Sequence, residues 1–107
     1  MKLEEFVRTI FAVTERSSLC EVVVIIALDE TTVKLRVLLY IDAYLDVYYN
    51  ERNSTTAYAM IQNGARIFGA DNANGWHYHP FDNPNSHVRL SQPVSFAEFL
   101  TMIEQKF

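Results

Sequence analysis

The three histidines of the chain, His77, His79 and His87, lie within one short polar segment. His77 and His79 are two positions apart, so on an extended backbone their side chains leave the same face. The Asn and Pro residues at 83–85 favour a turn that brings His87 back towards the pair. Imidazole titrates near neutral pH and is also a common metal ligand. The segment therefore predicts a site for acid–base chemistry or for a metal.

Acid–base catalysis without a metal is the chemistry that the sequence favours. His77 and His79 would share the roles of general base and general acid, and Asp71 would orient one imidazole. Arg66 or Arg89 would hold the charge of a phosphate group. These five residues are the predicted catalytic residues, and no cofactor is expected.

A divalent metal is the second interpretation of the same segment. His77, His79 and His87 would bind the ion and leave one position open for water. A cupin-type metal site adds a Glu three or four residues after His-x-His, and Asp82-Asn83 does not supply it. A third interpretation is structural, because a histidine in a loop is often only a polar residue with satisfied hydrogen bonds.

A functional site makes a geometric prediction. Proton transfer needs contacts of about 2.6–3.2 Å, directly or through one water. We therefore expect the rings of His77 and His79 to share one solvent-reachable concavity. A carboxylate from Asp71 or Asp82 should lie within hydrogen-bond reach of one ring, and an arginine should stand on the same rim.

The composition indicates one ordered domain over residues 1–107. Half of the residues are hydrophobic, which excludes intrinsic disorder, and the net charge of −4 disfavours a protein that coats nucleic acid by charge alone. The longest run without a polar residue is 22–28, far short of the ~20 residues of a membrane span. No secretory signal is apparent, and the single Cys20 fits a reducing, cytoplasmic location.

The elements that must position the histidines follow from apolar periodicity. An amphipathic pattern predicts a helix over 3–16, and a capping box of Ser95 and Glu98 starts a second helix. Alternating or continuous apolar runs predict strands at 20–28, 33–41, 44–52, 56–62 and 65–70, and a short sixth strand near 87–90. The strand 20–28 is expected to be buried on both faces. The segment 71–93 is expected to be a long irregular loop.

Short turns between successive strands require antiparallel pairing. The predicted fold class is therefore α+β: an antiparallel meander of five or six strands with the N- and C-terminal helices packed on one face. Leu38 and Tyr40 would stand on the other face, which is too apolar to be left in water. We therefore expect a homodimer, or a protein partner, that covers this second face.

One string of motifs resembles a known family, the TumE-like proteins, which are small prokaryotic proteins proposed to be the toxins of toxin–antitoxin pairs. The string is Gly64-x-x-Ile67, then Asp71-Asn72, then His77-x-His79. The family has an Asp-Asn pair at the end of a strand, then a Pro-His-His-x-His type of segment and a C-terminal helix. The resemblance covers roughly residues 33–107.

Two positions depart from the family pattern. Gly69 stands where the family usually has an arginine, and Trp76 stands in place of a histidine. Arg66 or Arg89 would have to replace the missing arginine. The resemblance implies a cytoplasmic protein encoded beside a small helix-turn-helix antitoxin.

Residues and resemblance together lead to two hypotheses. The first is a small metal-independent nuclease that acts on RNA. The alternative is a non-enzymatic binding or accessory module, in which the histidine-rich loop is a recognition surface or a metal-binding clip.

Overall fold

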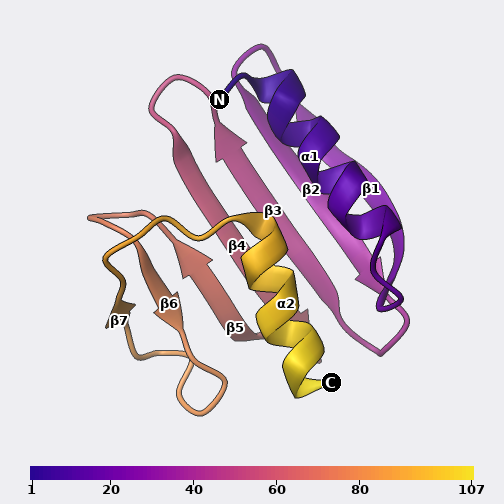
Figure 1. Cartoon of the computed structure of the whole chain (residues 1–107), viewed down its shortest axis with the longest axis vertical. Coiled ribbons are helices and arrows are strands. Elements are labelled where there is room, and N and C mark those ends of the chain that lie inside the picture. The colour runs from indigo at the N-terminus through magenta and orange to yellow at the C-terminus, as the bar shows by residue number, and fades with distance from the viewer.

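The chain forms one seven-stranded antiparallel sheet with a helix at each end of the sequence, as the computed structural model of residues 1–107 shows (Figure 1). The helices are α1 (Leu3–Glu15) and α2 (Phe96–Lys106). The strands are β1 (Cys20–Leu28), β2 (Thr32–Leu39), β3 (Tyr44–Asn50), β4 (Thr55–Gln62), β5 (Ala65–Asp71), β6 (His77–His79) and β7 (Val88–Arg89). Strands adjacent in sequence are adjacent in the sheet. The predicted α+β meander is confirmed, with seven strands where five or six were expected.

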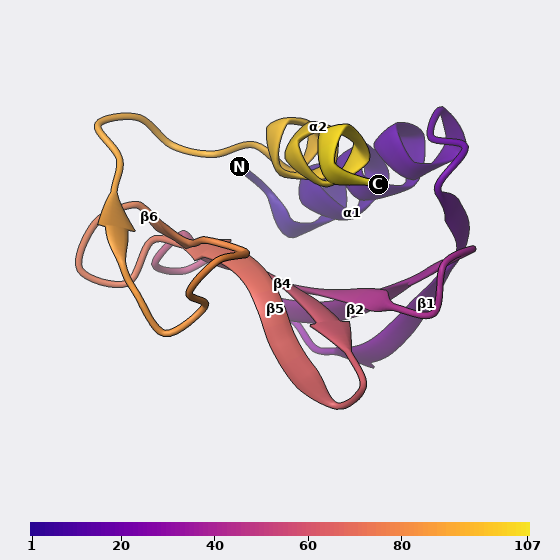
Figure 2. The same ribbon diagram turned by 90° about the horizontal axis from the view of Figure 1, so that it is seen from below.

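Both helices cover the same face of the sheet, as predicted, and the opposite face carries no helix (Figure 2). The strands β2 and β3 alternate between buried and half-buried residues, because successive side chains point to opposite faces. The core lies between this sheet face and the apolar stripes of the helices, where Ile10, Phe99 and Ile103 are fully buried. No helix is long and apolar enough to cross a membrane.

The prediction that the strand 20–28 is buried on both faces is wrong. β1 is the edge strand of the sheet and pairs only with β2. Five of the nine large hydrophobic residues that are exposed belong to β1. A continuous aliphatic run predicts a strand, but it does not determine whether the strand has one neighbour or two.

The prediction of an irregular loop over 71–93 is also corrected. This segment contains β6 and β7, which extend the sheet beyond β5. Strands of three and two residues are too short to produce an apolar period, so the pattern could not reveal them. Their pairing places Asp71 opposite His77, and His77 opposite Arg89.

The start of α2 is fixed by the predicted capping box. The Ser95 hydroxyl accepts a hydrogen bond from the Glu98 N–H at 3.1 Å, and the Glu98 carboxylate accepts one from the Ser95 N–H at 3.0 Å. The bond from the Ser95 N–H lowers the pKa of Glu98. The box anchors the helix that carries Phe99 into the core.

Replacing Ser95 with alanine leaves one N–H at the helix start without its partner. We expect a loss of about 1 kcal/mol in the free energy of unfolding, the typical cost of removing a serine cap. Urea unfolding monitored by circular dichroism measures this change. Thr101→Ala serves as the matched control, because Thr101 is exposed and lies within the same helix and not at its start. Equal losses for the two alanine variants would contradict a specific role of the cap.

Candidate functional site

The predicted site residues line one concavity with a volume of about 380 Å³. Its lining residues are Arg66, Asp71, Ala73, Asn74, His77, His79, His87 and Arg89. All five of the predicted catalytic residues are among them, and so is the third histidine. Asp82, the other carboxylate considered, is exposed and lies outside this lining. The convergence expected of a functional site is therefore present, and Asp71 supplies the carboxylate.

Pairing between short strands brings these side chains together. Asp71 is the last residue of β5, and β6 runs from His77 to His79 beside it. Residues directly opposite each other in an antiparallel pair point to the same face, so Asp71, His77 and Arg89 share one face. Tyr58 and Ala70 point to the helix-covered core. The site therefore lies on the sheet face away from the helices.

The carboxylate of Asp71 contacts both buried imidazoles. Its Oδ2 atom lies 3.2 Å from Nε2 of His79, and its Oδ1 atom lies 3.3 Å from Nε2 of His77. The two histidines are 3% and 8% exposed, respectively. One acidic side chain at the end of β5 thus holds two rings of the adjacent strand β6 in fixed positions.

The hydrogen bonds of the two buried rings determine which nitrogen is free. A carbonyl oxygen only accepts hydrogen bonds, so Nδ1 of His77 donates its proton to the carbonyl of Gly75 at 3.1 Å. The other nitrogen of this ring, Nε2, faces Oδ1 of Asp71 at 3.3 Å. In His79 the Nε2–H donates to Asp71, which leaves the lone pair on Nδ1. That Nδ1 atom is buried and has no hydrogen-bond partner.

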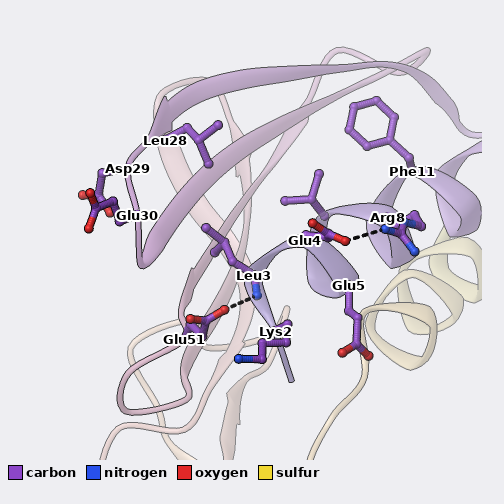
Figure 3. Close-up of a pocket in the computed structure, with 11 residues that line it drawn as sticks. Lys2, Leu3, Glu4, Glu5, Arg8, Phe11, Leu28, Asp29, Glu30 and Glu51 are labelled. Carbon is purple, nitrogen blue, oxygen red and sulfur yellow. Dashed lines mark hydrogen bonds and ion pairs between the residues drawn. The ribbon is translucent and has the colours of Figure 1, made fainter.

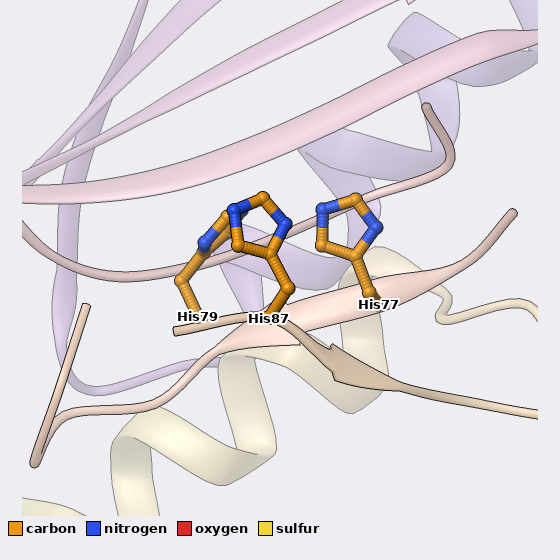
Figure 4. A group of neighbouring side chains, drawn as sticks. All are labelled: His77, His79 and His87. Atoms are coloured by element: carbon orange, nitrogen blue, oxygen red, sulfur yellow. The ribbon is translucent and has the colours of Figure 1, made fainter. Parts of the chain in front are cut away.

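The third imidazole, His87, completes the group from the exposed side (Figure 4). Its ring stacks on His77 with centroids 4.8 Å apart and lies 4.6 Å from the His79 ring. One nitrogen from each of the three rings lies within 4.8 Å of the others. Nitrogens bound to one tetrahedral Zn²⁺ lie about 3.3–3.4 Å apart. Binding of such an ion would therefore require the three rings to come closer together, and His87 is the one exposed ring of the three.

A metal-binding histidine commonly donates its other ring N–H to a carbonyl or a carboxylate. His77 does this to Gly75, and His79 does it to Asp71. His79 thereby keeps one nitrogen lone pair, on Nδ1, whereas Nε2 of His77 would bind a metal in place of its contact with Asp71. The arrangement suits a three-histidine metal centre with a fourth position for water.

Gly69 makes room for this arrangement. It lies directly opposite His79 in the sheet. A Cβ atom at Gly69 would lie 3.0 Å from the Tyr58 carbonyl oxygen, 3.3 Å from Cδ of Arg66 and 3.5 Å from Cδ2 of His79. The space that a side chain at 69 would occupy is thus filled by Arg66 and His79.

Two arginines give the concavity positive charge. Arg66 donates to the Pro84 carbonyl at 3.1 Å, and Arg89 donates to the Asn74 carbonyl at 3.1 Å. These hydrogen bonds connect the loops around the site to β5 and β7. A guanidinium has five N–H donors, so each arginine retains donors for an anion.

The backbone acceptor at Gly75 is the part of the site that sequence reasoning missed. A carbonyl carries no side-chain signal, but the Asn74-Gly75 pair is a turn signal that could have located it. Both residues have positive φ, of 56° and 97°. This turn directs the Gly75 carbonyl to the His77 ring.

The lone cysteine is not part of the site. Cys20 lies in β1, at the opposite end of the sheet from β6. Burial raises the pKa of its thiol, which disfavours the reactive thiolate.

No known family model, no curated protein and no solved structure gives a significant match to this chain. The resemblance to the TumE-like family stays a prediction that depends on the short motifs alone.

Proposed function

We propose that the chain is a metal-dependent phosphodiesterase that acts at the histidine concavity, with RNA as its substrate. The observation that carries the proposal is the hydrogen bonding of the buried rings. His79 donates its Nε2–H to Asp71 and keeps Nδ1 without a partner, and one nitrogen from each of the three rings lies within 4.8 Å of the others. The two arginines on the rim favour an anionic substrate.

This proposal replaces the metal-independent mechanism that the sequence favours. A general base or acid must reach the substrate with a free nitrogen. His77 and His79 are buried, and Nδ1 of His79 has no access to solvent. Only His87 is exposed. A buried lone pair without a partner costs about 1–3 kcal/mol, and a bound cation removes that cost.

The hydrolysis step assigns a role to each group. The oxygen of water forms a bond to phosphorus, while the bond between phosphorus and one ester oxygen breaks. The proton that the water loses passes to solvent, and the departing oxygen takes up a proton from solvent. A divalent ion at the three histidines would lower the pKa of the attacking water. Arg66 and Arg89 would stabilise the negative charge that develops on the phosphoryl oxygens.

The donor set selects the class of metal. Imidazole nitrogens favour zinc, copper, nickel and iron over magnesium or calcium, which prefer oxygen ligands. Zinc is the ion to test first, because three nitrogens with an open fourth position are typical of catalytic zinc.

A cleavage assay with fluorescent single-stranded RNA tests the proposed activity. The zinc-loaded protein should cleave the RNA, and EDTA should stop cleavage until zinc is restored in excess. The variant His79→Gln, purified in parallel, should be inactive, which separates this activity from contaminating nucleases. Zinc binding without cleavage of RNA or of a simple phosphodiester would instead favour the non-enzymatic metal-binding module.

The toxin role is proposed on the family resemblance. Expression in a bacterial host should then arrest growth, and a short neighbouring gene for a helix-turn-helix protein should relieve the arrest. A stable, folded His79→Gln variant should not arrest growth. Growth arrest by both the wild type and the variant would mean that toxicity does not depend on the histidine site.

A further inference from the structure

The exposed edge of β1 has the composition of an interface. Its nine residues are CEVVVIIAL, with Glu21 as the only charged residue and no proline. Val22, Val24, Ile25, Ile26 and Leu28 are 39–59% exposed. Edge strands of monomeric proteins are usually protected by lysine, proline or a short length, because their free N–H and C=O groups pair with other strands. β1 has none of these three protections.

We propose that β1 pairs antiparallel with β1 of a second copy of this chain, about a two-fold axis through Val24, so that two sheets join into one. In this register Val22 lies opposite Ile26 of the partner, and Val23 lies opposite Ile25. Glu21 lies opposite Ala27, so no like charges meet across the axis. The edge is therefore complementary to itself.

The register with β2 supports this central axis. The irregularities of β1 fall near its two ends, between Cys20 and Val22 and between Ile25 and Ala27. Residues 22–25 form the regular stretch between them, and this stretch is entirely aliphatic. Main-chain pairing about Val24 is therefore regular and apolar over residues 23–25, and it reaches the irregularity at Ile26, opposite Val22 of the partner.

A cavity of about 900 Å³ lies between β1 and α1, and Phe11 and Leu28 are two of its four hydrophobic lining residues (Figure 3). The other seven lining residues are charged, so the apolar surface on this side is limited to β1 and Phe11. Phe11 is 37% exposed and Ile25 is 50% exposed, so α1 leaves this side of β1 partly open. Covering these side chains on two copies buries on the order of 1,000 Å², close to the lower limit for a specific interface.

The proposal moves the expected dimer contact from one surface to another. The sequence placed it on the face of β2 and β3 that carries Leu38 and Tyr40. Leu38 is only half-buried beside β1 and β3, and Tyr40 lies in the turn after β2. The continuous exposed aliphatic surface is on β1 instead.

Sedimentation velocity of the purified chain at tens of micromolar tests the proposal. The sedimenting species should have twice the mass of one chain, which is 12.4 kDa. Val24→Glu should give a monomer, because the two introduced carboxylates face each other at the axis, and circular dichroism should show that the variant stays folded. Val24→Thr and Tyr40→Glu should remain dimers.

A crosslink gives a second test that does not depend on disrupting the interface. Opposite residues in antiparallel strands have Cα atoms about 4.5–5.5 Å apart, within the range for a disulfide. Oxidised Cys20→Ser/Val24→Cys should form a covalent dimer, and Cys20→Ser/Tyr40→Cys should not. A monomeric wild-type chain overturns the proposal, even if another protein binds the edge. So does a dimer that Val24→Glu leaves intact.

Discussion

Replacing His79 with glutamine is expected to lower the affinity for Zn²⁺ by more than about 100-fold, because it removes the buried ligand of the proposed centre. His79 is 3% exposed, and its Nδ1 atom has no other partner. Glutamine keeps a polar side chain of similar reach that can still donate to Asp71. Isothermal titration calorimetry with the wild type should give one zinc ion per chain and with the variant only weak binding.

Two variants that remove the same charge distinguish a specific effect at the site from a general effect of charge on zinc affinity. Asp71→Asn should lower the zinc affinity by about 10–100-fold, the usual effect of changing the acceptor behind a metal-binding histidine. Asp82→Asn removes the same charge from an exposed position in the neighbouring loop and should leave the affinity unchanged. Equal effects of the two variants would indicate a non-specific effect of charge and would contradict the centre.

The largest effect on stability is expected for Phe99→Ala. Phe99 is fully buried in α2, and its ring lies 5.2 Å from that of Phe68 and 5.1 Å from that of Tyr58. Truncation of a buried phenylalanine costs about 3–5 kcal/mol. Small domains have only about 5–15 kcal/mol in total, so the variant should be close to unfolding.

Urea unfolding measures this loss, and Phe107→Ala is the control. Phe107 is 55% exposed at the end of the same helix, so its truncation should change stability by less than about 1 kcal/mol. Loss of less than about 1 kcal/mol for Phe99→Ala would contradict the packing of α2 on the sheet described here.

Local signals in the sequence were sufficient to predict most of the fold. The capping box at Ser95 and Glu98 located the second helix, and the strands predicted at 56–62 and 65–70 are joined by a tight turn in which Asn63 and Gly64 have φ of 54° and 76°. These signals work because they depend on neighbouring residues alone. The exposure of β1 could not be predicted in this way, because it depends on the absence of a further strand beside it.

The residues of the site could be predicted, but their hydrogen bonds could not. The spacing of His77 and His79 placed both rings on one face, as the structure has them. Two facts changed the favoured chemistry: the Gly75 carbonyl accepts from His77, and Asp71 lies beside both rings and not only one. The first is a local contact that the Asn74-Gly75 turn signal could have located, and the second depends on the pairing of β5 with β6.

X-ray absorption at the zinc edge tests the central claim most directly, because it reports the ligands of the ion in solution. The zinc-loaded protein should show a first shell of nitrogen and oxygen at about 2.0–2.1 Å, with outer-shell scattering from three imidazole rings. The variant His79→Gln should lose part of that imidazole scattering. A first shell without imidazole scattering, or a sulfur ligand at about 2.3 Å from Cys20, would contradict the three-histidine centre.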